Sequence, residues 1–300
     1  MYYLVYGIFY LISLLPFFIL YGISDFFFLL MYYVIGYRKK VVMGNLAIAF
    51  PEKTIAQRRQ IARKFYRHFI DTFIESIKMI SMSDKAFTKR CTIDLEDAFR
   101  LAAMGKNIQF HCGHQMNWEY INWILGRDMT VIPFVGVYKS IGSKVFDRLF
   151  YKIRSRYKTI LVSTADFRSR MHGVFKSQYS IALAADQNPW NLDNAYWLYF
   201  FGKKTPFING PDKGAIRNNT SVIFMSLERK RRGYYHLNTK TVTENGAEMK
   251  KGELTRIYRD MLEDTIRKDP SNYLWTHKRW KHTFNETNEI FKRNWIDIEQ

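Results

Sequence analysis

Cysteine and acidic residues are both scarce in this sequence. Only Cys91 and Cys112 occur in 300 residues, too few for a disulfide framework, so a reducing compartment is favoured. Asp and Glu number 27 against 46 Lys and Arg, which gives a formal net charge of +19 at pH 7. A protein this basic needs an anionic partner or surface, and the candidates are nucleic acid, anionic lipid headgroups and phosphorylated substrates.

Internal repeats and low-complexity linkers are also missing, which argues against a repeat, collagenous or disordered protein. Apolar residues make up 47% of the chain, enough to bury one good core, so one main domain is expected. Aromatic residues, by contrast, are abundant at 17%. Some of them must form the core, and the excess suits a protein that contacts apolar chains or a bilayer.

The N-terminal residues favour a lipid surface among the possible anionic partners. The residues from Leu4 to Ile23 carry no charge, and a helix of ~20 residues would span a ~30 Å hydrocarbon layer. The chain starts MYY, with neither the basic segment nor the cleavage site of a signal peptide, so a retained anchor is expected. A buried core hairpin is the alternative. Arg38, Lys39 and Lys40 then favour a cytoplasmic position for the following chain.

We expect residues 1–37 to form the anchor and residues 38–300 to form the main domain. A second apolar run, FFFLLMYYVIGY, is too short to span alone and could lie in the membrane interface or return as a hairpin. Beyond it, apolar residues recur every four positions from Ile61 to Ile77, with Arg and Lys between them, which predicts an amphipathic helix. Its basic face could be solvated or could lie against anionic headgroups.

Short apolar runs alternate with helix-like segments from residue 107 onward. These runs are NIQFH, TVIPFVGVY, TILVST, SIALAAD and TSVIFMSLE. Together they predict an α/β fold, with a buried, mostly parallel mixed sheet flanked by helices. The run GYYHLNTKTVTE alternates more and is predicted as an edge strand. The last helix is predicted from about Glu253 to Lys268, because Asp269 and Pro270 follow.

The stretch FHCGHQMNWEY contains the strongest candidate site. On one continuous helix, residues five apart are rotated by about 140°, so His114 and Glu119 would not share a face. The sequence supplies a break, because NIQFH predicts a strand, CG a turn, and Asn117 the N-cap of a helix. His114 would then lie above the carboxyl end of the strand, where open α/β sheets bind ligands. Glu119 could hold one imidazole nitrogen while the other accepts a proton from a substrate hydroxyl.

Two other interpretations of this stretch stay open. An N-cap Asn followed by a first-turn Glu is ordinary helix chemistry, and most loop histidines have no catalytic role. His111, Cys112 and His114 are also acceptable zinc ligands. However, the sequence has no second Cys/His cluster for a fourth ligand, and adjacent strand residues point to opposite faces. No metal is therefore expected.

The segment HQMNWE resembles the H-x4-D/E motif of glycerolipid acyltransferases, in the H-x-x-N-W-E form of the bacterial lipid A biosynthesis (lauroyl/myristoyl) acyltransferase family. Four further blocks resemble that family in the same order across nearly the whole chain. They are RKKVVMGNLAIAFPEKT, Asp186-Gln187, FFGKKTPFINGP and NYLWTHKRWK. A lone H-x4-E is a weak signal, whereas five blocks in order are a specific one.

The resemblance implies a glycerolipid acyltransferase-like fold that needs no cofactor. It implies transfer of a fatty acyl group from an acyl carrier protein or coenzyme A thioester to a hydroxyl of a membrane lipid, usually a lipid A precursor. His114 would be the general base and Glu119 its orienting partner. The implied location is the inner (cytoplasmic) membrane, with the catalytic domain on the cytoplasmic side. The basic charge suits an anionic membrane surface, a phosphorylated lipid and an acidic carrier protein alike.

Several further residues are expected to bind substrate. They are Asn117, Arg154, Asp186, Gln187, Lys203, Lys204 and Thr205. Asp186 and Gln187 follow a predicted strand at its carboxyl end, although an Asp there could equally form a turn or cap. The block GKKT could bind phosphate or pantetheine, or could be a solvated surface loop. Arg154 lies on a basic helix face and could have no other role.

Other functions remain as alternatives. A nucleic-acid-binding protein is disfavoured, because it would not explain the anchor and would need a recognisable binding module. A non-catalytic basic membrane adaptor would not require His114 and Glu119. A lysophospholipid, aminolipid or glycolipid acceptor would present the same chemical task as a lipid A precursor. With water as acceptor the reaction would be that of a thioesterase.

Overall fold

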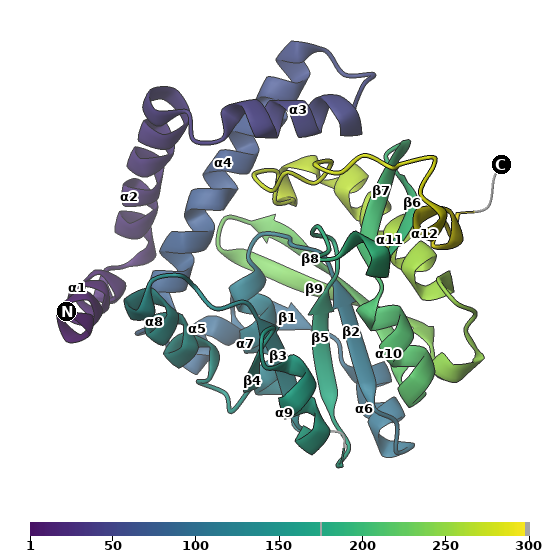
Figure 1. Cartoon of the computed structure of the whole chain (residues 1–300). Coiled ribbons are helices and arrows are strands. Elements are labelled where there is room, and N and C mark those ends of the chain that lie inside the picture. The colour runs from purple at the N-terminus through teal and green to yellow at the C-terminus, as the bar shows by residue number, and fades with distance from the viewer. Residues whose placement is uncertain (175, 298–300) are drawn as a thin grey trace.

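The computed structural model describes residues 1–174 and 176–297. Its centre is a sheet with the strand order β1-β9-β8-β2-β5-β3-β4 (Figure 1). The strands are β1 (Cys91–Ile93), β2 (Ile108–Cys112), β3 (Phe134–Tyr138), β4 (Ile160–Ser163), β5 (Ser180–Ala184), β8 (Ser221–Arg231) and β9 (Tyr234–Thr243). β2 pairs in parallel with β5 and β8, and β3 pairs in parallel with β4 and β5. The predicted α/β fold with a mostly parallel sheet is confirmed.

The five predicted apolar runs form β2 to β5 and β8, but two features of the fold differ from expectation. β9 is antiparallel to β8 and is not an edge strand, because the short strand β1 pairs in parallel with its other side. The FFGKKTPFINGP block forms the second half of a separate hairpin, β6 (Ala195–Phe200) and β7 (Lys203–Ile208). Phe201 and Gly202 close this hairpin with positive φ angles of 51° and 69°, which suit a tight two-residue turn.

Helices cover both faces of the sheet (Figure 1). One face packs against α5 (Asp84–Thr88), α6 (Glu96–Ala103), α7 (Trp118–Asp128) and α8 (Lys144–Arg154). The other packs against α9 (Phe167–Val174), α10 (Gly210–Asn218) and α11 (Glu253–Lys268). A short helix, α12 (Glu289–Arg293), lies near the end of the chain. The last long helix thus has the predicted bounds, and it ends where Asp269 and Pro270 prevent its continuation.

Four helices precede the sheet. They are α1 (Tyr2–Leu14), α2 (Phe17–Leu29), α3 (Lys39–Ala49) and α4 (Ile55–Lys78), and a π-helical turn extends α2 to Ile35. α4 is the predicted amphipathic helix, and it begins with a capping box between Thr54 and Gln57. The uncharged run from Leu4 to Ile23 is not one helix, because the first helix ends before Pro16, whose ring favours a helix start. The helix long and apolar enough to cross a membrane runs instead from Phe17 to Ile35.

Candidate active site

Two neighbouring parallel strands bring the first pair of site residues together. His114 lies two residues beyond the end of β2, and Asp186 lies two residues beyond the end of β5. The two strands are paired in parallel, with Cys112 opposite Ala184. Because parallel strands end at the same edge of a sheet, both side chains lie at the carboxyl edge, where ligands bind in such folds.

Asp186 holds His114 through both its backbone and its ring. The His114 imidazole Nδ1 is 2.6 Å from Asp186 Oδ1, and the His114 N–H donates to Asp186 Oδ2 at 2.9 Å. The Asp186 side chain is 1% exposed and that of His114 is 25% exposed. Burial alone would lower the pKa of His114, but the charge and hydrogen bond of Asp186 raise this pKa above the ordinary histidine value. Burial likewise opposes ionisation of Asp186, yet the neighbouring imidazole lowers the pKa of Asp186.

This pairing leaves one ring nitrogen for chemistry. A carboxylate on Nδ1 favours the neutral tautomer that carries its proton there, so Nε2 has a free lone pair. In the described part of the chain Nε2 has no hydrogen-bond partner. The ring edge packs against Trp118, with the two ring centroids 6.4 Å apart. His114 is therefore built to accept a proton at Nε2.

Residues from the C-terminal half position this pair. The Tyr258 hydroxyl donates to the Cys112 carbonyl at 2.8 Å and accepts from the Ala185 N–H at 3.3 Å, which ties the ends of β2 and β5 together. The Leu274 N–H donates to the His114 carbonyl at 3.1 Å. Arg279, 1% exposed, adds a positive charge that contributes to the low pKa of Asp186. The block NYLWTHKRWK indicated this region, whereas Tyr258 had no signal in the sequence.

Glu119 makes a different contact from the one predicted. As expected, Asn117 caps α7, its side-chain oxygen accepting from the Glu119 N–H at 3.1 Å. The Glu119 carboxylate, however, binds Arg154 with two hydrogen bonds, from Nε at 2.9 Å and from Nη2 at 2.6 Å. It also accepts from the indole of Trp118 at 3.1 Å. The predicted contact between Glu119 and the imidazole is therefore wrong, while a catalytic role for Glu119 stays a prediction.

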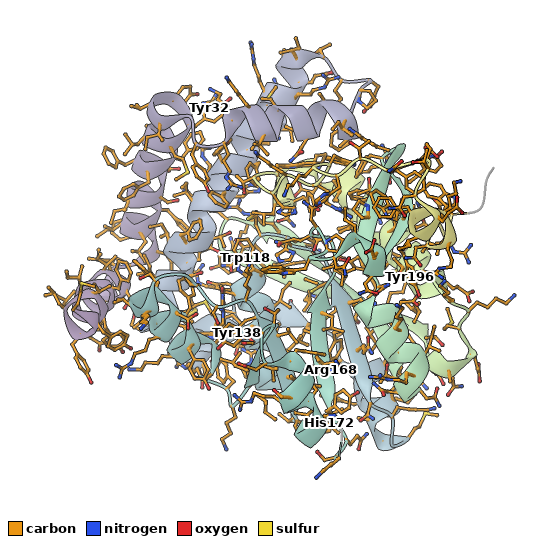
Figure 2. The ribbon with its side chains drawn as sticks, in the orientation of Figure 1. Tyr32, Trp118, Tyr138, Arg168, His172 and Tyr196 are labelled. Carbon is orange, nitrogen blue, oxygen red and sulfur yellow. The ribbon has the colours of Figure 1, made fainter. Side chains whose placement is uncertain are left out.

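His114 and Glu119 nevertheless line the same cavity, which has a volume of about 360 Å³. Arg154, Gln187 and Trp118 also line it, and small residues of the sheet, namely Gly136, Ala182 and Ala184, leave the space open. Figure 2 shows Trp118 and Tyr138, two lining residues, on the side of α7 and α8, away from Arg168 and His172 of α9. The cavity thus places a base, a paired cation and an apolar wall around one space.

The remaining predicted residues lie outside this cavity. Asn117 is buried behind it, where its amide donates to Glu75 Oε2 at 3.1 Å. Lys203, Lys204 and Thr205 are on β7. Lys204 pairs with Glu286 at 2.6 Å, and the buried Thr205 hydroxyl donates to the Lys203 carbonyl at 2.6 Å. The structure does not bring these three residues to His114, and their role in substrate binding stays a prediction.

Metal-ligating side chains do not converge at this site. Among residues 1–174 and 176–297 there is no group of three or more His, Cys, Asp and Glu side chains that could hold a metal ion. His111 Nε2 instead lies 2.9 Å from the side-chain amide of Gln109. Burial lowers the pKa of His111 to about 4 and raises the pKa of Cys112 to about 12. Both are neutral core residues.

The chain was compared with known proteins. No curated protein matches it. A family model described as bacterial lipid A biosynthesis acyltransferase matches residues 1–282. This match covers nearly the whole chain, including the His114 loop, Asp186 and the C-terminal residues that position them. The chain therefore belongs to the bacterial lipid A biosynthesis acyltransferase family.

Proposed function

We propose that this acyltransferase moves a fatty acyl group from an acyl carrier protein or coenzyme A thioester to a hydroxyl of a lipid A precursor. The observation that carries the proposal is the 2.6 Å contact between His114 Nδ1 and Asp186, with His114 lining a cavity of about 360 Å³. Acyl transfer to a hydroxyl needs a base at this position, because a neutral alcohol is a poor nucleophile.

His114 acts as the general base in this proposal. Its Nε2 takes the proton of the acceptor hydroxyl as the oxygen attacks the thioester carbonyl. The new C–O bond forms, the C–S bond breaks, and the proton then passes from Nε2 to the departing thiolate. Asp186 keeps the proton on Nδ1 and stabilises the imidazolium that forms during the step. No side-chain nucleophile and no covalent intermediate on the enzyme are required.

Glu119 and Arg154 supply fixed charge on the other side of the cavity. The guanidinium has two of its nitrogens bound to Glu119, at 2.6 and 2.9 Å. We assign its third nitrogen, Nη1, to negative charge in the cavity, either the oxyanion of the thioester carbonyl or a phosphate of the acceptor. Glu119 is then a positioning residue for Arg154 rather than for His114. Lys139 also lines the cavity and adds to its positive charge.

The protein is placed at the cytoplasmic face of the inner membrane in this proposal. The family acts on membrane lipids, and the apolar helix from Phe17 to Ile35 supplies a surface for a bilayer. The net charge of +19 suits anionic headgroups, a phosphorylated acceptor and an acidic carrier protein. In this proposal the acceptor is a membrane lipid, and the donor is an acyl carrier protein or coenzyme A thioester.

An acyl-transfer assay in membranes tests the proposal. Labelled acyl carrier protein and coenzyme A thioesters are offered with a panel of acceptors, namely lipid A precursor, lysophospholipid, aminolipid and glycolipid. Wild type is expected to label the lipid A precursor, and His114→Ala is expected to label nothing. His172→Ala is the matched control, because His172 is an exposed histidine of α9 outside the His114 cavity. Labelling of a different lipid would identify that lipid as the acceptor. Equal labelling by wild type and His114→Ala would show that His114 is not the general base.

A further inference from the structure

The two N-terminal helices carry a large apolar surface that faces away from the sheet. At the left of Figure 1 the helix from Phe17 to Ile35 lies beside α4, on the side away from the sheet, and α1 lies at the lower end of α2, next to α8. The most exposed apolar side chains on these helices are 66% to 76% exposed, and they are Tyr3, Leu4, Leu11, Phe18 and Val34. Soluble monomers rarely expose a continuous apolar area of this kind, so it marks an interaction surface.

Basic side chains border this surface by contacting its aromatic rings. Arg148 and Lys152 of α8 lie 4.2 Å from the ring centroids of Tyr2 and Tyr6. At the other end Arg38 lies 5.8 Å from the ring centroid of Tyr37, which is 41% exposed. Aromatic rings beside cations are typical of the boundary between hydrocarbon and headgroups, where the rings enter the apolar layer and the cations meet phosphates.

Polar contacts on the opposite face of α2 fasten it to the rest of the protein. The Ser24 hydroxyl donates to Asp71 of α4 at 2.6 Å, and the Tyr21 hydroxyl donates to Glu75 of α4 at 3.0 Å. Asp25 accepts two hydrogen bonds from Arg232, at the β8–β9 turn, both at 3.0 Å. The charged partners thus come from α4 and from the sheet, so α2 is built into the main domain.

These contacts are incompatible with a helix that crosses the bilayer. Asp25 is near the middle of the helix from Phe17 to Ile35, and crossing would place its carboxylate at the bilayer centre, away from Arg232. An aspartate there is strongly disfavoured. α1, with 13 residues, is about 20 Å long and cannot cross a hydrocarbon layer of about 30 Å.

We propose that α1, α2 and the turn to Ile35 bind one leaflet of an anionic bilayer while lying along it, and that neither helix crosses the membrane. This inference rests on the membrane association in the proposed function and specifies its form. The same Glu75 carboxylate that accepts from Tyr21 also accepts from Asn117, at the start of α7. The buried Glu75 carboxylate therefore connects the membrane-bound helix to the start of α7, next to the loop that carries His114.

Protease accessibility of an N-terminal tag tests the topology of the full-length protein in spheroplasts. A polar tag with a cleavage site is added before Met1, and the same tag is added after the C-terminus as a control. If the helices lie along one leaflet, both tags resist external protease in intact spheroplasts and both are cut in inverted vesicles. Cleavage of the N-terminal tag alone from outside would show that a helix crosses, and would overturn the inference.

Partition of the purified protein into vesicles tests the lipid partner. Phe18→Glu and Val34→Glu are each expected to lower partition into phosphatidylglycerol–phosphatidylethanolamine vesicles by roughly tenfold or more, because each removes a large apolar side chain from the contact. Met104→Glu, a change at a 56% exposed methionine after α6, is the control and should bind as wild type does. Unchanged partition of both variants would overturn the inference. The oligomeric state of each variant is measured as well, because loss of self-association with unchanged partition would show that this surface binds a second copy of the chain and would also overturn the inference. Neither readout uses acyl transfer, so this outcome is separate from that of the catalytic proposal.

Discussion

His114 and Asp186 are 72 positions apart in the chain, yet the imidazole Nδ1 of one lies 2.6 Å from the carboxylate of the other. The contact exists because β2 and β5 are neighbours in the sheet and end at the same edge. A second hydrogen bond, from the His114 N–H to Asp186, fixes the loop as well as the ring. The carboxylate that orients the His114 imidazole thus follows β5, outside the H-x4-E motif.

Glu119 and Arg154 are expected to act as one unit. Their side chains are 3% and 16% exposed, and removing one member of a buried ion pair costs about 3–5 kcal/mol of stability. Glu119→Gln should therefore lower the free energy of unfolding by a large part of this amount. Because Arg154 would be misplaced, kcat should also fall by about 10- to 100-fold. Chemical denaturation and steady-state kinetics measure the two effects. Glu96→Gln, an exposed first-turn glutamate of α6, is the control.

A double-mutant cycle separates this account from one in which Glu119 orients His114. With Glu119 acting through Arg154, the combined variant Glu119→Gln/Arg154→Met should be no slower than Arg154→Met alone. Rate losses that multiply would show that Glu119 has a role independent of Arg154.

Ala184 is expected to limit the length of the acyl chain that the cavity accepts. It ends β5 and lines the His114 cavity, whereas the preceding residue, Leu183, lines a separate cavity on the other face of the sheet. Ala184→Phe should lower kcat/KM for long-chain donors by about tenfold or more, with a smaller effect on short-chain donors, because the ring fills space near the base. Leu183→Phe should keep the chain-length profile. Equal profiles for wild type and Ala184→Phe would place the acyl chain elsewhere.

Tyr258 is expected to stabilise the site without touching substrate. Tyr258→Phe removes the hydroxyl that joins the Cys112 carbonyl to the Ala185 N–H and should cost about 1–3 kcal/mol of stability, since it leaves buried backbone groups unpaired. kcat should fall more than KM rises, because His114 and Asp186 both follow these strand ends. Thermal denaturation and kinetics test this, with Tyr151→Phe, a 46% exposed tyrosine of α8, as the control. A KM effect alone would place Tyr258 in substrate binding.

Local patterns in the sequence predicted most of the elements around the site. The apolar runs identified β2 to β5 and β8, and the end of α11 followed from Asp269 and Pro270. The strand–turn–helix arrangement around His114 was also correct, including Asn117 as the cap of α7. Each of these features depends on periodicity or on a residue's own conformational preference, which a sequence carries within a few positions.

Contacts that depend on strand order could not be predicted in the same way. The sequence placed Asp186 at a strand end but did not show that β5 is adjacent to β2. The spacing alone therefore predicts that His114 pairs with the nearest carboxylate along the chain, Glu119. The absence of charge from Leu4 to Ile23 predicts one helix, whereas Pro16 divides this run into two. Arg232, which binds both Asp25 and Asp71 and helps to hold α2 in place, comes from the β8–β9 turn, more than 150 residues away from either.

The pH dependence of kcat/KM in wild type and Asp186→Asn tests the central claim most directly. A general base works when deprotonated, so the rate should rise with pH through the pKa of His114, which Asp186 holds above the ordinary histidine value. Asp186→Asn removes this negative charge. Its plateau should fall by roughly 10²–10⁴-fold, and the midpoint of the rise should move to lower pH. A midpoint that stays in place, or a plateau that equals that of wild type, would contradict the pairing of His114 with Asp186 as the catalytic base.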